Sequence, residues 1–181
     1  MPINKELLAQ FCSQDDNKPH MQEPWSEDNS SYATDGHVIV CTNRLTDVKE
    51  NENAPKNISN AVFKLLFAQA SNFVSIHSSF CQQVSQLPNY TACSTCQGSG
   101  SCSCHACNND HNCGECQGIG AKPTTLLAFG RTFKVKQLQL ILALPNLNWD
   151  LTVDDARIPF KFTGGSGIIV AQTNKESIPN V

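Results

Sequence analysis

The sequence predicts an α+β fold in which an antiparallel sheet carries helices on one face and a small cysteine-rich module is inserted into the chain. Three observations support this prediction. Short apolar stretches are separated by tight-turn signals, three other stretches have apolar residues at helical spacing, and residues 91–122 are dominated by Cys, Gly and Ser. The 181 residues, 40% of them hydrophobic, suffice for one packed domain and a small appendage.

The part of the chain before the cysteines contains two predicted helices and a predicted hairpin. Leu7, Leu8 and Phe11 fall on one face of the first helix, and the Asp35-Gly36 pair tolerates the positive φ values of a tight hairpin turn. The expected elements are a helix over 3–13, strands over 32–34 and 37–42, a loop over 43–57, a helix over 57–70 and a strand over 73–78.

The part after the cysteines is expected to be mostly strands. Pro145 closes a helix in which Leu138, Ile141 and Leu142 share one face. The expected elements are two strands around Gly130 within 124–135, the helix over 135–144, and short strands over 148–153, 158–162 and 167–172. The last two strands are joined by the glycine-rich turn at 164–166, which strand-like residues follow. A phosphate-binding loop would instead lead into a helix.

Net charge and apolar runs argue against several functional classes, although nucleic acid remains a possible partner that the charge does not favour. A net charge of −3 gives no general attraction to nucleic acid or to anionic lipid, and no Lys or Arg lies between Leu65 and Ala121. No apolar run approaches the roughly 18–20 residues of a membrane span, and the N-terminus lacks a signal-peptide pattern. We therefore expect a cytoplasmic protein in a reducing compartment, where closely spaced cysteines favour metal over disulfides.

Two C-x2-C pairs predict a zinc site. Zn²⁺ prefers a tetrahedron of thiolates, and two intervening residues let both sulfurs of a pair reach one ion. Each pair continues in the same way, as "CQGSG" at 96–100 and "CQGIG" at 116–120, so two equivalent knuckles should face each other across the ion. The expected ligands are Cys93, Cys96, Cys113 and Cys116.

The stretch between the two knuckles offers ligands for a second zinc. These are Cys102, Cys104, Cys107 and His111, with His105 as a spare candidate. Other uses of the thiols are less favoured. A thioredoxin-like pair would need a βαβ context, and a catalytic zinc would need an open position and a nearby base, for which Glu115 is a poor candidate.

The C-x2-C-x-G-x-G repeat resembles the cysteine-rich zinc finger of DnaJ-type cochaperones, which carry four such repeats and bind two zincs. The match covers residues 93–120, with two full repeats and one that lacks its glycines. The His-Pro-Asp motif of a J domain is absent from the sequence. The resemblance implies a metal-binding finger at 91–122 rather than chaperone activity.

A second resemblance concerns the flanking residues. "YATDGHVIV" at 32–40 is similar to a strand-turn-strand of bacterial DNA polymerase sliding clamps, and residues 131–172 are similar to the closing section of a clamp domain. This implies one clamp-like domain formed by 1–90 and 123–181, of a kind found in phages and prophages. A clamp chain has three such domains, so a ring would need about six copies of this chain or a partner.

The combined interpretation is a non-enzymatic, zinc-binding accessory protein that acts through protein contacts, with a homo-oligomer as an open possibility. As a phage protein it would modulate replication or host factors. The alternatives are a DNA-binding clamp component and a thiol-redox or chaperone-like protein. We expect no catalytic residues, because Asp35 and His37 flank a tight turn and no nucleophile–base arrangement is apparent.

Overall fold

The computed structural model describes residues 3–51, 54, 67, 70–103, 109–152 and 156–172, and these form an α+β structure. Its centre is a seven-stranded sheet in the order β1-β2-β3-β13-β12-β11-β4, in which every neighbouring pair is antiparallel. The strands are β1 (Trp25–Glu27), β2 (Ser30–Thr34), β3 (Val38–Asn43), β4 (Val74–Ser75), β11 (Asn148–Trp149), β12 (Arg157–Phe162) and β13 (Gly165–Val170). The antiparallel sheet predicted from the sequence is confirmed.

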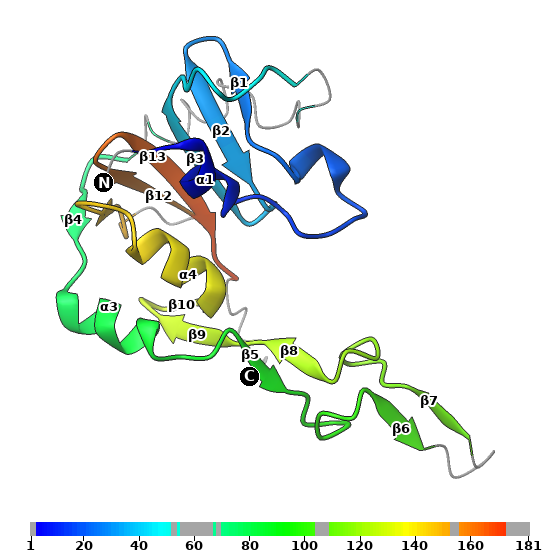
Figure 1. The fold of residues 1–181 in the computed structure, drawn as a ribbon. Helices are drawn as coiled ribbons and strands as arrows, with labels where there is room; N and C mark the ends of the chain where they lie inside the picture. The colour runs from blue at the N-terminus through cyan, green and yellow to red at the C-terminus, as the bar shows by residue number, and fades with distance from the viewer. Residues whose placement is uncertain are drawn as a thin grey trace, which may run out of the picture.

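Two helices pack on one face of this sheet and form the main core with it (Figure 1). They are α1 (Lys5–Ala9) and α4 (Val135–Leu142). The strands alternate as a half-covered sheet requires, since Val38 and Val40 of β3 face this core whereas Ile39 faces the other side. The predicted helix over 3–13 is shorter in the structure, although Phe11 beyond its end is still buried in the core.

One turn and one strand show why the sequence needs glycine at particular positions. Asp35 Oδ1 accepts hydrogen bonds from the backbone N–H of His37 and Val38, and Gly36 has φ +91°, so the Asp-Gly turn between β2 and β3 is confirmed. In β13, a Cβ on Gly167 would overlap the Phe160 ring. The glycine-rich stretch at 164–167 therefore serves the sheet, because a side chain there would displace a core aromatic residue.

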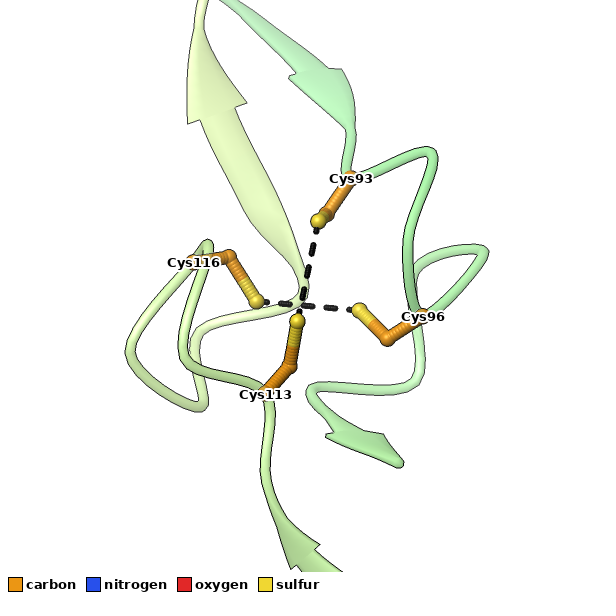
Figure 2. A group of neighbouring side chains, drawn as sticks. All are labelled: Cys93, Cys96, Cys113 and Cys116. Carbon is orange, nitrogen blue, oxygen red and sulfur yellow. Dashed lines mark hydrogen bonds between the residues drawn. The ribbon is translucent and has the colours of Figure 1, made fainter. Parts of the chain in front are cut away.

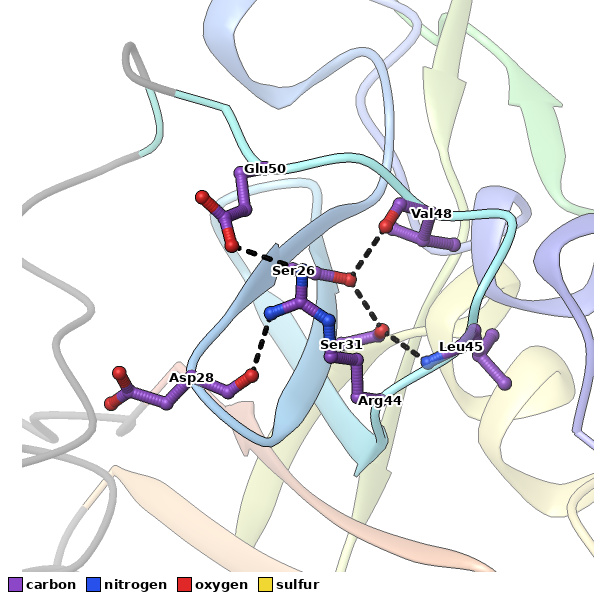
Figure 3. Close-up of polar contacts among 7 residues, drawn as sticks. All are labelled: Ser26, Asp28, Ser31, Arg44, Leu45, Val48 and Glu50. Carbon is purple, nitrogen blue, oxygen red and sulfur yellow. Dashed lines mark hydrogen bonds and ion pairs between the residues drawn. The ribbon is translucent and has the colours of Figure 1, made fainter.

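The loop over 44–50 covers the edge strand β1 (Figure 3). Ser26 Oγ lies 2.8 Å from Ser31 Oγ and donates to the Val48 carbonyl at 2.9 Å. Arg44 donates to the Asp28 carbonyl and pairs with Glu50 at 3.0 Å. The Ser26 N–H also donates to the Lys49 carbonyl at 2.9 Å, a backbone group that an open sheet edge would leave to solvent or to another chain.

The helix α3 (Ser78–Ser85) was not predicted. The strand expected over 73–78 is limited to β4, and α3 begins directly after it, with the His77 ring accepting from the Ser79 N–H. Only Phe80 and Val84 give α3 an apolar stripe, which is too short to register as helical periodicity. Gln139 of α4 fixes it by donating to two carbonyls at its C-terminal end.

Four hairpin strands extend from the end of the body that carries β9 (Thr125–Ala128) and β10 (Arg131–Lys134), the pair predicted around Gly130 (Figure 1). We call residues 90–123 the cysteine arm. In it β5 (Tyr90–Ala92) pairs with β8 (Ala121–Pro123), and β6 (Ser101–Ser103) pairs with β7 (Asp110–Asn112).

The helix predicted over 57–70 lies almost wholly outside the described residues. Within that range Phe67 is described, and it packs on the second face of the sheet with Trp25 and Tyr32. No helix in the described part of the chain combines the length and the apolar character needed to cross a membrane.

Candidate metal centre

The cysteine arm consists of two equivalent halves. Cys93 follows β5 and Cys113 follows β7, and an offset of 20 residues relates the two halves. The backbone hydrogen bonds repeat with the same offset. Cys93 N–H donates to the Gly120 carbonyl at 2.8 Å, and Cys113 N–H donates to the Gly100 carbonyl at 2.8 Å. Each half is therefore tied to the end of the other.

Glycines make this close approach possible. Gly100 and Gly120 have φ values of +78° and +79°, and a Cβ on either would overlap a carbonyl of the opposite knuckle, that of Gly118 or Gly98. Their N–H groups point at sulfur, because Gly100 donates to Cys96 Sγ at 3.3 Å and Gly120 donates to Cys116 Sγ at 3.2 Å. The repeated glycines thus let the knuckles meet and supply hydrogen bonds to the sulfurs.

The four cysteine side chains point toward one another (Figure 2), and their sulfurs all lie within 4.8 Å of one another. The Cys93–Cys113 sulfur distance is 3.9 Å and the Cys96–Cys116 distance is 3.6 Å. A tetrahedron with metal–sulfur bonds of about 2.3 Å has sulfur–sulfur edges of about 3.8 Å. These two distances match the edges of such a tetrahedron, and the whole set is compatible with one tetrahedral ion.

Burial and hydrogen bonding act on the thiols in opposite directions. All four cysteines are at most 8% exposed. Backbone N–H groups of Cys116 and Glu115 lower the pKa of the Cys113 thiol to about 6, whereas burial raises the pKa of Cys116 to about 11. Without a cation, four thiolates in one buried cluster repel one another, and a divalent ion would remove this cost.

One ion pair lies at the edge of this cluster. Lys122 Nζ contacts Glu115 Oε2 at 2.6 Å on the arm surface. The Glu115 carboxylate is thus paired with a cation, which makes it a poor candidate for a general base. The sequence pattern does not indicate this pair directly, because seven positions separate the partners along the chain.

The second predicted ligand set is only partly described. Cys104, Cys107 and the spare candidate His105 lie outside the described residues. Cys102 and His111 are opposite each other across β6 and β7. Cys102 also packs against the four buried sulfurs of the first site, a contact that spacing alone did not predict. The second zinc site stays a prediction.

Asp35, His37 and Cys12, which the sequence predicts to be structural, make contacts within the body. Lys134 Nζ lies 2.8 Å from His37 Nε2, and Gln137 donates to Asp35 Oδ2 at 2.8 Å, so these groups link the β2–β3 turn to α4. Cys12 is buried in the core, which raises the pKa of its thiol to about 11, as expected of a packing residue.

A cavity of about 590 Å³ lies between α3 and β9, lined by Phe80, Val84, Leu87 and Leu126 among others. Gln83 and Gln86 also line it, and the part of its lining that α3 contributes was not predicted from the sequence.

Comparisons with known proteins add no relative to this picture. No family model matches the chain, no curated protein matches it, and no solved structure matches it.

Proposed function

We propose that the four buried cysteines bind one Zn²⁺ as a structural centre that holds the cysteine arm together. The observation that supports this most is that four sulfurs from two facing knuckles lie within 4.8 Å of one another. Zinc fits the donor set because it favours four thiolates in a tetrahedron and needs no redox chemistry to stay bound. The free thiols of the described cysteines are consistent with this use, since disulfides would consume the ligands.

A structural role fits the surroundings better than a catalytic one. A catalytic zinc has three protein ligands and an open position for water or substrate. Here four thiols are buried together, and Glu115 is held by Lys122 on the surface. We therefore propose a non-enzymatic protein, in which the metal replaces the apolar core that the arm does not have.

The arm would then serve as a rigid platform for a protein partner. Between the last cysteine and the last glycine of the repeated unit, its two knuckles differ at one position, Ser99 in the first and Ile119 in the second. Ser99 Oγ donates to backbone carbonyls, whereas the Ile119 side chain is 75% exposed. An apolar side chain on a metal-held turn is suited to contact protein. The one Lys of the arm, Lys122, is paired with Glu115, so the arm has little positive charge to offer nucleic acid.

We propose the body as the carrier of this platform. On the resemblance described above, it is a single clamp-like domain formed by 1–90 and 123–181 with the finger at 91–122 inserted. The seven-stranded antiparallel sheet with α1 and α4 on one face supports such a domain without identifying it. The accessory role in replication or on host factors rests on the same resemblance.

Metal analysis tests the zinc site first. Protein purified under reducing conditions should contain at least one zinc per chain, and Cys93→Ser or Cys116→Ser should lose one equivalent. Cys81→Ser, at a half-buried cysteine outside the cluster, is the matched control and should keep the metal. Full metal content in both cluster variants would contradict the assignment.

Affinity capture tests the platform. Wild-type protein and Ile119→Ser, which makes the second knuckle resemble the first, should differ in the partner that they retain while binding equal amounts of zinc. A salt titration on DNA separates the alternative, because a clamp component that binds DNA would show affinity that falls steeply with salt. Equal capture by both proteins would rule out Ile119 as the contact.

A further inference from the structure

A fifth thiol lies beside the metal centre. Cys102 on β6 is half-buried, packs against the four-cysteine cluster and interacts with the Cys113 thiol. It is not one of the four sulfurs that lie within 4.8 Å of one another. Cys102 is therefore close enough to contact a ligand sulfur and yet outside the closed ligand set.

The repeat of the arm gives a comparison for this position. With the offset of 20 residues, β6 corresponds to β8 and Cys102 corresponds to Lys122. Lys122 places a positive charge near Cys93 and Cys113, which suits a centre that carries four thiolates. At the equivalent position β6 has the Cys102 thiol instead of a cation, although a cation would stabilise the negative charge of four thiolates.

We propose that Cys102 makes the zinc centre sensitive to oxidation by hydroperoxides, an inference that rests on the proposed zinc site. The Cys113 thiolate attacks the peroxide O–O bond, takes one oxygen as a sulfenic acid, and the other oxygen leaves as water or alcohol with a proton from solvent. The Cys102 sulfur then attacks the Cys113 sulfur. Its proton and the sulfenic hydroxyl leave as water, and a Cys102–Cys113 disulfide remains.

The electrons balance in this sequence, because the two thiols lose two electrons and the peroxide O–O bond gains them. The disulfide removes one of the four ligands, so the ion loses its closed tetrahedron and dissociates. Cys102 is suited to the second step because its sulfur lies outside the set of four that would hold the first zinc. The cysteines of the body do not belong to this cluster in the described part of the chain.

The experiment compares zinc-loaded wild-type protein, Cys102→Ser and Cys81→Ser during exposure to hydrogen peroxide. Zinc release is followed with a chromogenic chelator, and disulfides are mapped by mass spectrometry of peptides. We expect wild type and Cys81→Ser to release zinc about tenfold faster than Cys102→Ser, since a neighbouring thiol resolves the sulfenic acid. The map should show Cys102 joined to Cys113, and a thiol reductant with added zinc should reverse the change.

Three results would overturn the proposal. They are equal release from wild type and Cys102→Ser, disulfides confined to the four ligand cysteines, and a reduced Cys102→Ser protein that has lost its zinc, which would make Cys102 a ligand. Reduced wild-type protein without any zinc would instead refute the proposed function. Metal analysis before the addition of peroxide therefore separates the two failures.

Discussion

The body and the cysteine arm are stabilised in different ways. In the body, large side chains such as Trp149 and Phe160 are fully buried between the sheet and its helices. In the described part of the arm, the only buried residues are four cysteines and the glycines Gly100 and Gly120. Apolar burial therefore supports the first region, whereas the second has sulfur atoms and tight backbone contacts where a core would be.

This difference predicts that the arm can lose its structure while the body keeps its own. Chelation of the metal, or Cys116→Ser, should unfold the arm, because zinc binding to such sites contributes about 10–16 kcal/mol of apparent folding free energy. Both tryptophans lie in the body, so their fluorescence should not change, whereas proteolysis between 93 and 120 should become fast. A change in tryptophan fluorescence that accompanies the faster proteolysis would show that the two regions fold as one unit.

The converse change should affect only the body. Trp149→Ala removes a fully buried side chain that contacts Phe129, Phe133 and Phe160, and should lower the free energy of unfolding by about 3–5 kcal/mol. Zinc content should stay the same. Trp149→Phe is the milder control, since its smaller ring also removes an indole N–H that is buried without a partner among the described residues. Urea titrations of the variants measure the difference.

The glycines of the knuckles should show how tightly the arm is packed. Gly120→Ala adds a Cβ that overlaps the Gly98 carbonyl at a φ of +79°, and should weaken metal binding by about 1–3 kcal/mol. Gly114→Ala is the matched control, because no atom of the described residues lies within 4 Å of its added Cβ and its φ is not positive. Competition with a chelator measures both affinities, and equal losses would contradict the close approach of the knuckles.

The same two regions differ in how well the sequence predicts them. The C-x2-C-x-G-x-G repeat fixes the sulfurs and the glycines at short range, so the facing knuckles could be predicted from spacing alone. The contact of Cys102 with the cluster could not, because it depends on how β6 pairs with β7. In the body, Asp35-Gly36 predicted its hairpin, whereas α3 has too few apolar residues for periodicity and depends on the tertiary contact with Gln139.

The smallest expected effect is a pH dependence that belongs to the body. Burial and the nearby Lys134 lower the pKa of His37, with Asp35 and Lys18 also facing the ring. Because the unfolded chain then binds a proton more readily than the folded one, stability should fall as pH drops below the ordinary histidine pKa of about 6.5, and level off below the lowered value.

His37→Gln separates this effect from others, since its amide oxygen can still accept from Lys134 and does not titrate. Thermal midpoints followed by tryptophan fluorescence between pH 7.5 and 5.5 should fall less in this variant than in wild type. Hydrogen bonds from Thr152, Asn72 and Ser71 lower the pKa of buried Asp150 below its ordinary value. Its contribution to the free energy of unfolding is therefore lost only in stronger acid than this pH range. Acid also releases zinc from thiolates, and chelator-treated protein should therefore show the same slope. If the thermal midpoint depends on pH only in the zinc-loaded protein, the pH dependence arises in the arm and not from His37 in the body.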